Sequence, residues 1–214
     1  MRGCQSISIM TAVNTTITSI DLSLALLDDS SMKWIAKILE ENITLKELYL
    51  SESNIHDEGI EHIMNALVKN NTLKILDISY INITVQCIPS IFNMIRYNQG
   101  ITDLFFDMDD DDDDNDDNHI DEMQMILESF QHNTTLLYVD HKEFKKELSD
   151  DISKFMHRNQ MIHQKTRQLR CNYILFCHKI RNSLGYNEYW NYCLKDIFEY
   201  AREFVRVAQI MKYK

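Results

Sequence analysis

Hydrophobic positions in the first three quarters of the chain follow two alternating spacings. Short stretches such as Leu48-Tyr49-Leu50 place an aliphatic residue at every second position, which predicts a half-buried β-strand. Each is followed, after a loop, by apolar residues three and four positions apart, which predicts an amphipathic helix. The expected helical stripes are Met32, Ile35, Ala36, Ile38 and Leu39; Ile60, Ile63, Met64, Leu67 and Val68; Ile88, Ile91, Phe92 and Ile95; and Ile120, Met123, Ile126, Leu127 and Phe130.

A four-residue motif, Asn-x-Thr/Gly-Ile/Leu, marks a repeat between these elements. It begins at Asn14, Asn42, Asn70 and Asn98, so the same spacing of 28 residues occurs three times in succession. The motif returns after 35 residues at Asn133 and, in a weaker form, at position 159. A fixed period in this range is typical of solenoid proteins. We interpret the Asn-x-Thr segments as helix-to-strand turns rather than as sugar acceptors, because these side chains bond readily to turn backbone.

The repeated unit itself has a recognisable pattern. Its best examples are LKELYLSESNI at residues 45–55 and LKILDISYINI at residues 73–83. Both resemble leucine-rich repeats of the ribonuclease-inhibitor subtype. The resemblance implies an α/β leucine-rich-repeat solenoid, curved, with parallel strands inside and helices outside, because one unit alone cannot bury its apolar face. We assign Asn54 and Asn82 a structural role, with their amides turned inward to bond the loop backbone of adjacent turns.

The spacing of the repeats divides the chain into three parts. We expect a lead-in over 1–13, about five leucine-rich repeats over 14–161 and a helical C-terminal cap over 162–214. The cap is predicted as a hairpin of two helices near 163–183 and 187–212, with a docking or dimerisation element as the alternative.

The fourth repeat is seven residues longer than the units before it, because of an acidic loop at 107–118. Insertions in solenoids fall in such loops. We expect the run from Asp109 to Asp117 to be a solvated loop, and the alternatives are a hook for a basic partner or a metal site. The run lacks the glycine that a calcium-binding loop of the usual type requires.

Strand alternation predicts which residues face the concave surface. The candidate partner-binding residues are Asp21, Glu47, Tyr49, Ser51, Asp77, Asp103, Phe105 and Asp107, and the series continues through Tyr138, Asp140 and Lys142. The middle positions of successive strands form one predicted row of acidic and aromatic side chains: Asp21, Tyr49, Asp77, Phe105 and Asp140. The mixture predicts a protein-binding face with Tyr49 and Phe105 as anchors. The alternative is an ordinary solvated sheet surface.

Charge and motif content exclude several classes of function. Residues 1–160 carry 12 lysines and arginines against 29 acidic residues, whereas residues 161–214 carry 10 against 4. An acidic body repels phosphate, so we expect no nucleic-acid partner. Five scattered cysteines, with neither a signal peptide nor an apolar span, predict a cytoplasmic protein that does not enter a membrane.

The sequence also lacks the motifs of common enzymes. It contains no HExxH segment, no glycine-rich phosphate loop and no nucleophile elbow, so we expect no enzyme, no catalytic residue and no cofactor. Cys171, Cys177, His178 and Cys193 lack the paired spacing of structural zinc ligands, so no metal site is predicted.

The order and wording of the repeats resemble the repeat domain of tropomodulin and leiomodin, the actin pointed-end proteins. The resemblance lies in the repeat number, the stretched fourth repeat and the segments LYLSESNI at 48–55 and MILESFQHNTTLL at 125–137, and it spans residues 14–170. It implies a protein–protein interaction scaffold. The partner is unidentified, and the alternative that the resemblance implies is a tropomodulin-like actin-binding or capping protein.

Overall fold

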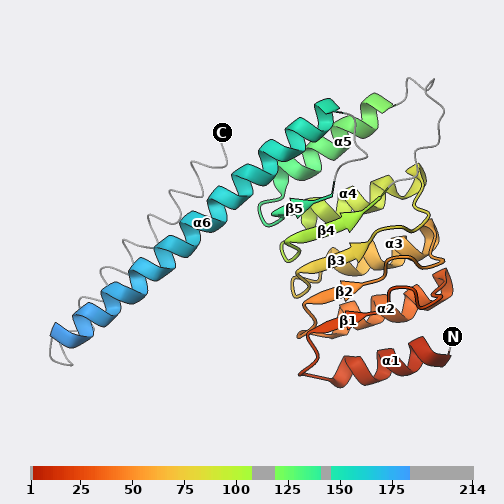
Figure 1. Cartoon of the computed structure of the whole chain (residues 1–214), viewed down its shortest axis with the longest axis horizontal. Helices are drawn as coiled ribbons and strands as arrows, with labels where there is room; N and C mark the ends of the chain where they lie inside the picture. Colours follow the sequence, from red (N-terminus) through yellow and green to blue (C-terminus); the bar gives the residue numbers. More distant parts are fainter. Residues whose placement is uncertain (1, 108–118, 141–145, 184–214) are drawn as a thin grey trace. The chain divides into compact units, whose positions relative to one another are not determined.

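The computed structural model describes residues 2–107, 119–140 and 146–183 of the 214-residue chain. Five short strands form one parallel sheet in chain order: β1 (Ser19–Asp21), β2 (Glu47–Tyr49), β3 (Ile75–Ile78), β4 (Asp103–Phe106) and β5 (Tyr138–Val139). The helices are α1 (Arg2–Val13), α2 (Asp29–Glu41), α3 (Asp57–Leu67), α4 (Ile88–Tyr97, after a 3-10 turn at Val85–Cys87), α5 (His119–His132) and α6 (Lys146–Ser183). Figure 1 shows the strands side by side, with α2 to α5 along one face of the sheet. The predicted solenoid is confirmed.

The chain forms two compact units, residues 1–159 and 160–214. The first unit contains the whole sheet, helices α1 to α5 and the start of α6. Within the described residues, none of the helices is both long enough and apolar enough to cross a membrane.

The 28-residue spacing of the sequence is the structural period of the sheet. Parallel pairing sets Leu48 beside Ile20, Leu76 beside Leu48 and Leu104 beside Leu76, and these three leucines are at most 1% exposed. The helical stripes complete this core. All predicted stripe residues of α2, α3 and α4 are buried, except that Val68 is half-buried. In α5, Ile126 and Phe130 are buried, Leu127 is half-buried, and the side chains of Ile120 and Met123 lie outside the described residues.

A column of asparagines joins successive turns of the solenoid. The Asn98 side chain accepts hydrogen bonds at Oδ1 from the backbone N–H groups of Gly100 and Ile101, both at 2.8 Å. Its Nδ2 donates to the carbonyls of Leu67 and Asn70 in the preceding turn, at 2.6 and 2.7 Å. Asn42 and Asn133 make the same four kinds of bond, and Asn70 makes three of them. The repeated Asn therefore satisfies turn backbone, which confirms the interpretation of the Asn-x-Thr segments.

The structural role predicted for Asn54 and Asn82 is wrong, because both residues are exposed. Each stands directly before a fully buried isoleucine, Ile55 or Ile83. Neighbouring residues on an extended chain point in opposite directions, so these asparagines turn outward. The inward position lies one residue earlier, where Ile81 is 4% exposed in the third repeat.

The first turns of α6 close the C-terminal end of the repeats. Leu148, Ile152 and Met156 are buried in the core of the first unit. Asn159 supplies the last rung of the asparagine column, and its Nδ2 donates to the carbonyls of Asn133 and Leu136 at 3.2 and 2.8 Å. A helix therefore covers the last repeat ahead of the predicted cap.

Parts of the predicted domain organisation lie outside the described residues. The predicted cap boundary at 162 falls inside α6, which continues without a break to Ser183. The second helix of the hairpin, near 187–212, and the acidic run from Asp109 to Asp117 both lie outside the described residues. The hairpin and the acidic loop therefore stay predictions.

Candidate protein-binding surface

The sheet surface opposite the helices carries the predicted binding residues, and we call it the concave face. Leu48, Leu76 and Leu104 turn to the core, so the residues beside them on each strand turn outward. Asp21 is exposed and the other seven predicted residues are half-buried: Glu47, Tyr49, Ser51, Asp77, Asp103, Phe105 and Asp107. Asp140 is half-buried as well, and Lys142 lies outside the described residues.

Strand register arranges these side chains in two rows across the sheet. One row runs Asp21, Tyr49, Asp77 and Phe105, as the sequence predicted. The second row runs Ser19, Glu47, Ile75, Asp103 and Tyr138. No lysine or arginine occurs within the five described strands. The two rows therefore present carboxylates and aromatic rings without a neutralising cation on the strands themselves.

Hydrogen bonds within a turn and between neighbouring turns hold the carboxylates of this face. Asp77 Oδ1 accepts from the backbone N–H and from the hydroxyl of Ser79, at 3.0 and 2.7 Å. Asp107 Oδ2 accepts from the backbone N–H of Tyr80 at 2.8 Å. Backbone and side-chain hydrogen bonds from Ser23 lower the pKa of Asp21. These bonds favour the ionised form of Asp21. The predicted residues of the face include five acidic side chains, and its described strands carry no lysine or arginine, so the face is negative at neutral pH.

Tyr49 lies among these charges. Its hydroxyl donates to Glu47 Oε2 at 3.5 Å. Partial burial raises the pKa of the Tyr49 phenol, and the negative charges of Glu47, Asp77 and Asp21 raise it further. The phenol is therefore neutral at physiological pH, and its ring is a flat apolar surface with a polar tip, as is common in binding sites.

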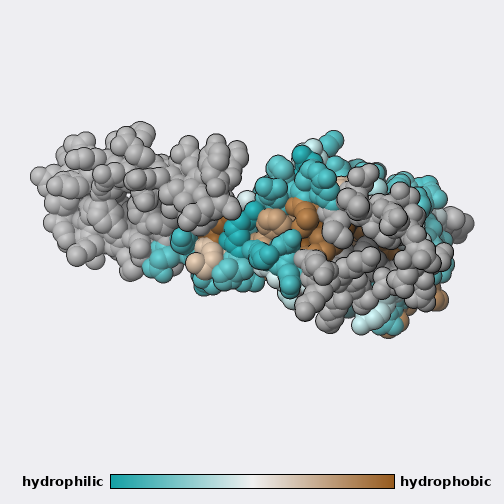
Figure 2. Space-filling view, turned by 90° about the horizontal axis from the view of Figure 1, so that it is seen from above, coloured by the Kyte–Doolittle hydropathy of each residue, from teal (hydrophilic) through white to brown (hydrophobic). Residues whose placement is uncertain are grey.

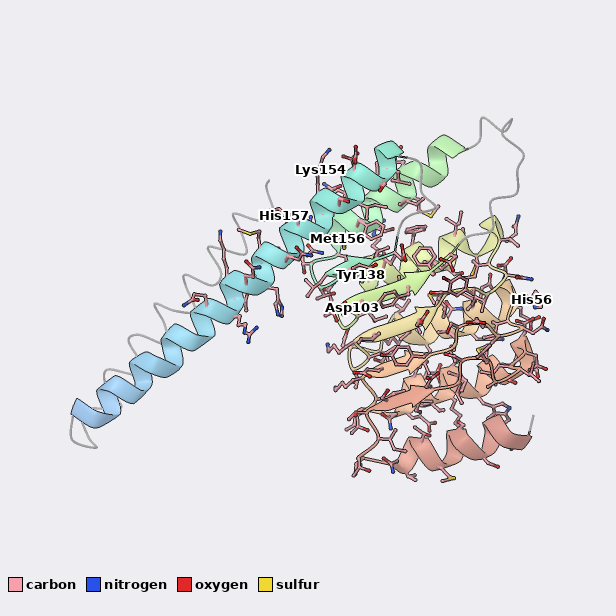
Figure 3. All side chains as sticks on the ribbon, in the orientation of Figure 1. His56, Asp103, Tyr138, Lys154, Met156 and His157 are labelled. Atoms are coloured by element: carbon pink, nitrogen blue, oxygen red, sulfur yellow. The ribbon has the colours of Figure 1, made fainter. Side chains whose placement is uncertain are left out.

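A second aromatic group occupies the C-terminal side of the face. The rings of Phe105 and Tyr138 lie 5.1 Å apart between centroids, with an interplanar angle of 40°. Asp103 and Tyr138 are paired residues of the adjacent strands β4 and β5, and Figure 3 labels both. The sequence predicted both residues on the concave face and Phe105 as an anchor, but it did not predict Tyr138 as a second anchor in contact with it. The signal was the row assignment itself, since adjacent strands bring neighbouring row positions within contact distance.

Large hydrophobic residues are also exposed elsewhere on the first unit, among them Leu26 at 91%, Val13 at 80% and Ile43 at 77%. In the view of Figure 2, hydrophilic residues make up most of the coloured surface, with a smaller hydrophobic area among them. Tyr138, at 44% exposed, is among the large hydrophobic residues that remain accessible. Aromatic side chains surrounded by charged ones are the usual composition of a protein-binding centre and its rim.

The described residues contain few groups suited to chemistry. They include no cluster of three or more His, Cys, Asp or Glu side chains that could hold a metal ion. Cys87 is fully buried, and desolvation together with the nearby Asp57 and Glu61 raises the pKa of its thiol to about 12. A thiol with so high a pKa is a poor nucleophile at neutral pH. The side chains of Cys171, Cys177, His178 and Cys193 lie outside the described residues.

Comparison with known proteins supports the repeat assignment. The leucine-rich-repeat family matches at residues 41–64, which span β2 and the first part of α3. No curated protein sequence matches the chain. A solved structure described as leiomodin-1 actin-binding site 2 is similar, with 19% identity and a TM-score of 0.66 over 79% of this chain and 95% of that one. The tropomodulin C-terminal domain of Caenorhabditis elegans is also similar, with 12% identity and a TM-score of 0.63 over 80% of this chain and 98% of that one.

These similarities agree with the geometry described above. The matched segment contains β2, the loop after it and the first part of α3, and both solved structures are covered almost from end to end. At these identities the structural likeness concerns the fold. The chain has the fold of a leucine-rich-repeat solenoid, and its layout resembles that of the tropomodulin and leiomodin repeat domains.

Proposed function

We propose that this protein is a non-enzymatic, cytoplasmic interaction scaffold that binds a protein partner through its concave face. The observation that carries the proposal is the arrangement around Phe105, whose ring contacts that of Tyr138. Asp77 is paired with Phe105 on the neighbouring strand β3, and Asp103 is paired with Tyr138 two residues before Phe105 on β4. Partly exposed aromatic rings release water when a partner covers them, and such residues dominate the energy of protein interfaces.

The carboxylates determine the kind of protein that fits. Asp21, Glu47, Asp77, Asp103 and Asp107 make the face negative, so a partner with a basic surface would be attracted and a phosphate backbone repelled. The asparagine column holds successive turns at a fixed spacing, so the face is rigid before binding. A preorganised surface loses less conformational entropy on association.

Truncation of the two predicted anchors tests this proposal. We expect the double change Tyr49→Ala/Phe105→Ala to abolish capture of the main partner from the native cell extract and to weaken its affinity by a factor of about 30 or more. Quantitative affinity capture identifies the partner, and titration calorimetry with that purified partner measures the loss.

A matched control changes two exposed residues on the helical side, Glu40→Ala and Glu61→Ala. This variant should retain full capture because it leaves the concave face intact. If the anchor variant folds normally and still binds the same partner with unchanged affinity, the concave face is not the binding site.

Actin binding is the second candidate function, because one of the similar solved structures is described as an actin-binding site. A tropomodulin-like protein should bind monomeric actin in a pull-down and slow elongation at the pointed end in a pyrene-actin assay. The same anchor variant shows whether any such effect depends on the concave face. Absence of binding together with unchanged pointed-end growth would exclude this candidate.

A further inference from the structure

At the N-terminal end of the solenoid, α1 stands in the place of a repeat, but no described strand accompanies it. β1 is the first strand of the sheet, and no described strand pairs with its outer side. Helix α1 precedes it and packs against α2, in the helix layer. In Figure 1, α1 lies beyond α2 at this end of the stack, and β1 is the last strand there. The sheet therefore ends in an open edge.

The side chains of the first repeat are less buried than their equivalents one period later. Ile17 is 38% exposed, whereas the residues at the same position of the next three repeats are at most 2% exposed: Leu45, Leu73 and Ile101. Ile20 and Leu22 are half-buried, whereas their equivalents are at most 3% exposed: Leu48, Leu76 and Leu104, and Leu50, Ile78 and Phe106. In later repeats, the strand of the preceding turn covers one side of these residues. Within the described residues, no strand precedes β1 to cover its outer side.

The backbone of β1 pairs with no other described strand on that side. Thr18 accepts hydrogen bonds from the N–H groups of Lys46 and Glu47, and Leu22 donates to the carbonyl of Tyr49 at 2.9 Å, so both residues face β2. Residues of a parallel strand bond alternately to one neighbour and the other. Ser19 and Asp21 therefore direct their amides and carbonyls to the outer edge, where such unpaired groups form a template for another strand.

The opposite end of the same sheet shows how this fold closes an end. There the last repeat residues Leu136 and Val139 are each 2% exposed, because the first turns of α6 cover the end of the core. The described residues supply no matching cover at β1. The core side chains are therefore covered at the C-terminal end of the sheet and partly exposed at the N-terminal end.

We propose that this edge binds an extended segment of a partner protein, which adds a strand beside β1 in the place a preceding repeat would take. The recognised segment has aliphatic residues at alternate positions, to continue the core past Ile20 and Leu22. It has a lysine or arginine between them, in the row of the exposed Asp21. Strand addition obtains affinity from backbone bonds and specificity from alternate side chains. This edge is separate from the Tyr49 and Phe105 anchors, so the inference goes beyond the proposed function.

The repeat itself supplies the probe. A peptide with the sequence of residues 72–80 and the change Asp77→Lys would place Leu76 and Ile78 beside Ile20 and Leu22, and the new lysine beside Asp21, if it entered the open position. We expect the fluorescently labelled peptide to bind the full chain saturably in an anisotropy titration. The same peptide with Asp77 retained should bind several-fold more weakly, because it places a carboxylate beside Asp21.

Two variants of the protein locate the binding site. Ser19→Pro removes an N–H group that the strand register directs to the outer edge, and should weaken peptide binding by a factor of about ten or more. Ser19→Ala keeps that group and should bind like the wild type. Ile17→Lys places a charge at the partly exposed N-terminal end of the core and should weaken peptide binding as well. It serves as a second variant if Ser19→Pro does not fold.

The outcomes separate the alternatives. Loss of binding in Ser19→Pro and Ile17→Lys, with unchanged binding in Ser19→Ala and in the Tyr49→Ala/Phe105→Ala variant, supports strand addition at β1. Equal binding to all variants, or no binding of the peptide to the wild type, overturns it. Light scattering that shows a wild-type dimer dissociated by Ser19→Pro also overturns it, since the occupant would then be a second copy of the chain.

Discussion

Replacing Asn98 with alanine is expected to lower the free energy of unfolding by about 4 kcal/mol. The side chain of Asn98 is 1% exposed and makes four hydrogen bonds that connect two turns. Its removal leaves the N–H groups of Gly100 and Ile101 and the carbonyls of Leu67 and Asn70 without these partners. Each buried polar group left unsatisfied costs about 1–3 kcal/mol, and partial relaxation and entry of water reduce the sum.

Urea denaturation followed by circular dichroism measures this loss. The matched control is Asn82→Ala, which changes an exposed asparagine in the neighbouring repeat and should shift stability by no more than about 0.5 kcal/mol. If the two variants lost equal stability, the asparagine column would not join the turns as described.

Arg158→Ala should lower the stability of the repeat unit by about 2–3 kcal/mol. The guanidinium of Arg158 donates to the carbonyls of Gln131 and Phe130 at the end of α5, at 2.9 and 3.1 Å, and also to that of Asn133. It further donates to Asn159 Oδ1, at 3.0 Å from Nε and 2.9 Å from Nη2. The Arg158 side chain therefore provides donors for the last carbonyls of α5 and positions Asn159, the last residue of the asparagine column.

The planar, forked geometry of arginine is what this site requires. Burial lowers the pKa of Arg158, but guanidinium groups are protonated throughout the physiological range. Lysine offers a single donor atom, so Arg158→Lys should recover only a small part of the loss. The exposed Arg167 is the control, and Arg167→Ala should leave thermal unfolding unchanged. Full recovery in Arg158→Lys would show that charge alone, rather than the set of directed bonds, holds this end.

Periodicity was sufficient to predict the solenoid, the strand faces and the helical stripes. A 28-residue spacing leaves little freedom, because each side chain must pack on its equivalent one turn away. The same logic placed Tyr49, Asp77 and Phe105 in one row. Local pattern was less informative in the strand-to-helix loops, where a shift of one residue reverses the direction of a side chain. Asn54 and Asn82 were assigned inward on a motif match, although their position beside Ile55 and Ile83 already implied the outward direction.

Long-range contacts account for what the sequence did not show. Arg158 follows the carbonyls it caps by about one repeat length, and nothing in its immediate surroundings marks it as a helix cap. The contact of Phe105 with Tyr138 depends on the neighbouring strand returning after the stretched fourth repeat. The open edge at β1 is marked by the exposure of Ile17, whose equivalents in the next three repeats are buried, and this difference depends on contacts between turns.

Photo-crosslinking from the concave face is the most direct test of its role in binding. A photoreactive phenylalanine analogue is placed at Phe105 in one protein and at the exposed Glu61 of α3 in another, and both are irradiated in the native cell extract. We predict a discrete adduct with one partner from position 105, competed by unlabelled wild-type protein, and no corresponding adduct from position 61. A partner that crosslinks from position 61 and not from position 105 would contradict concave-face binding.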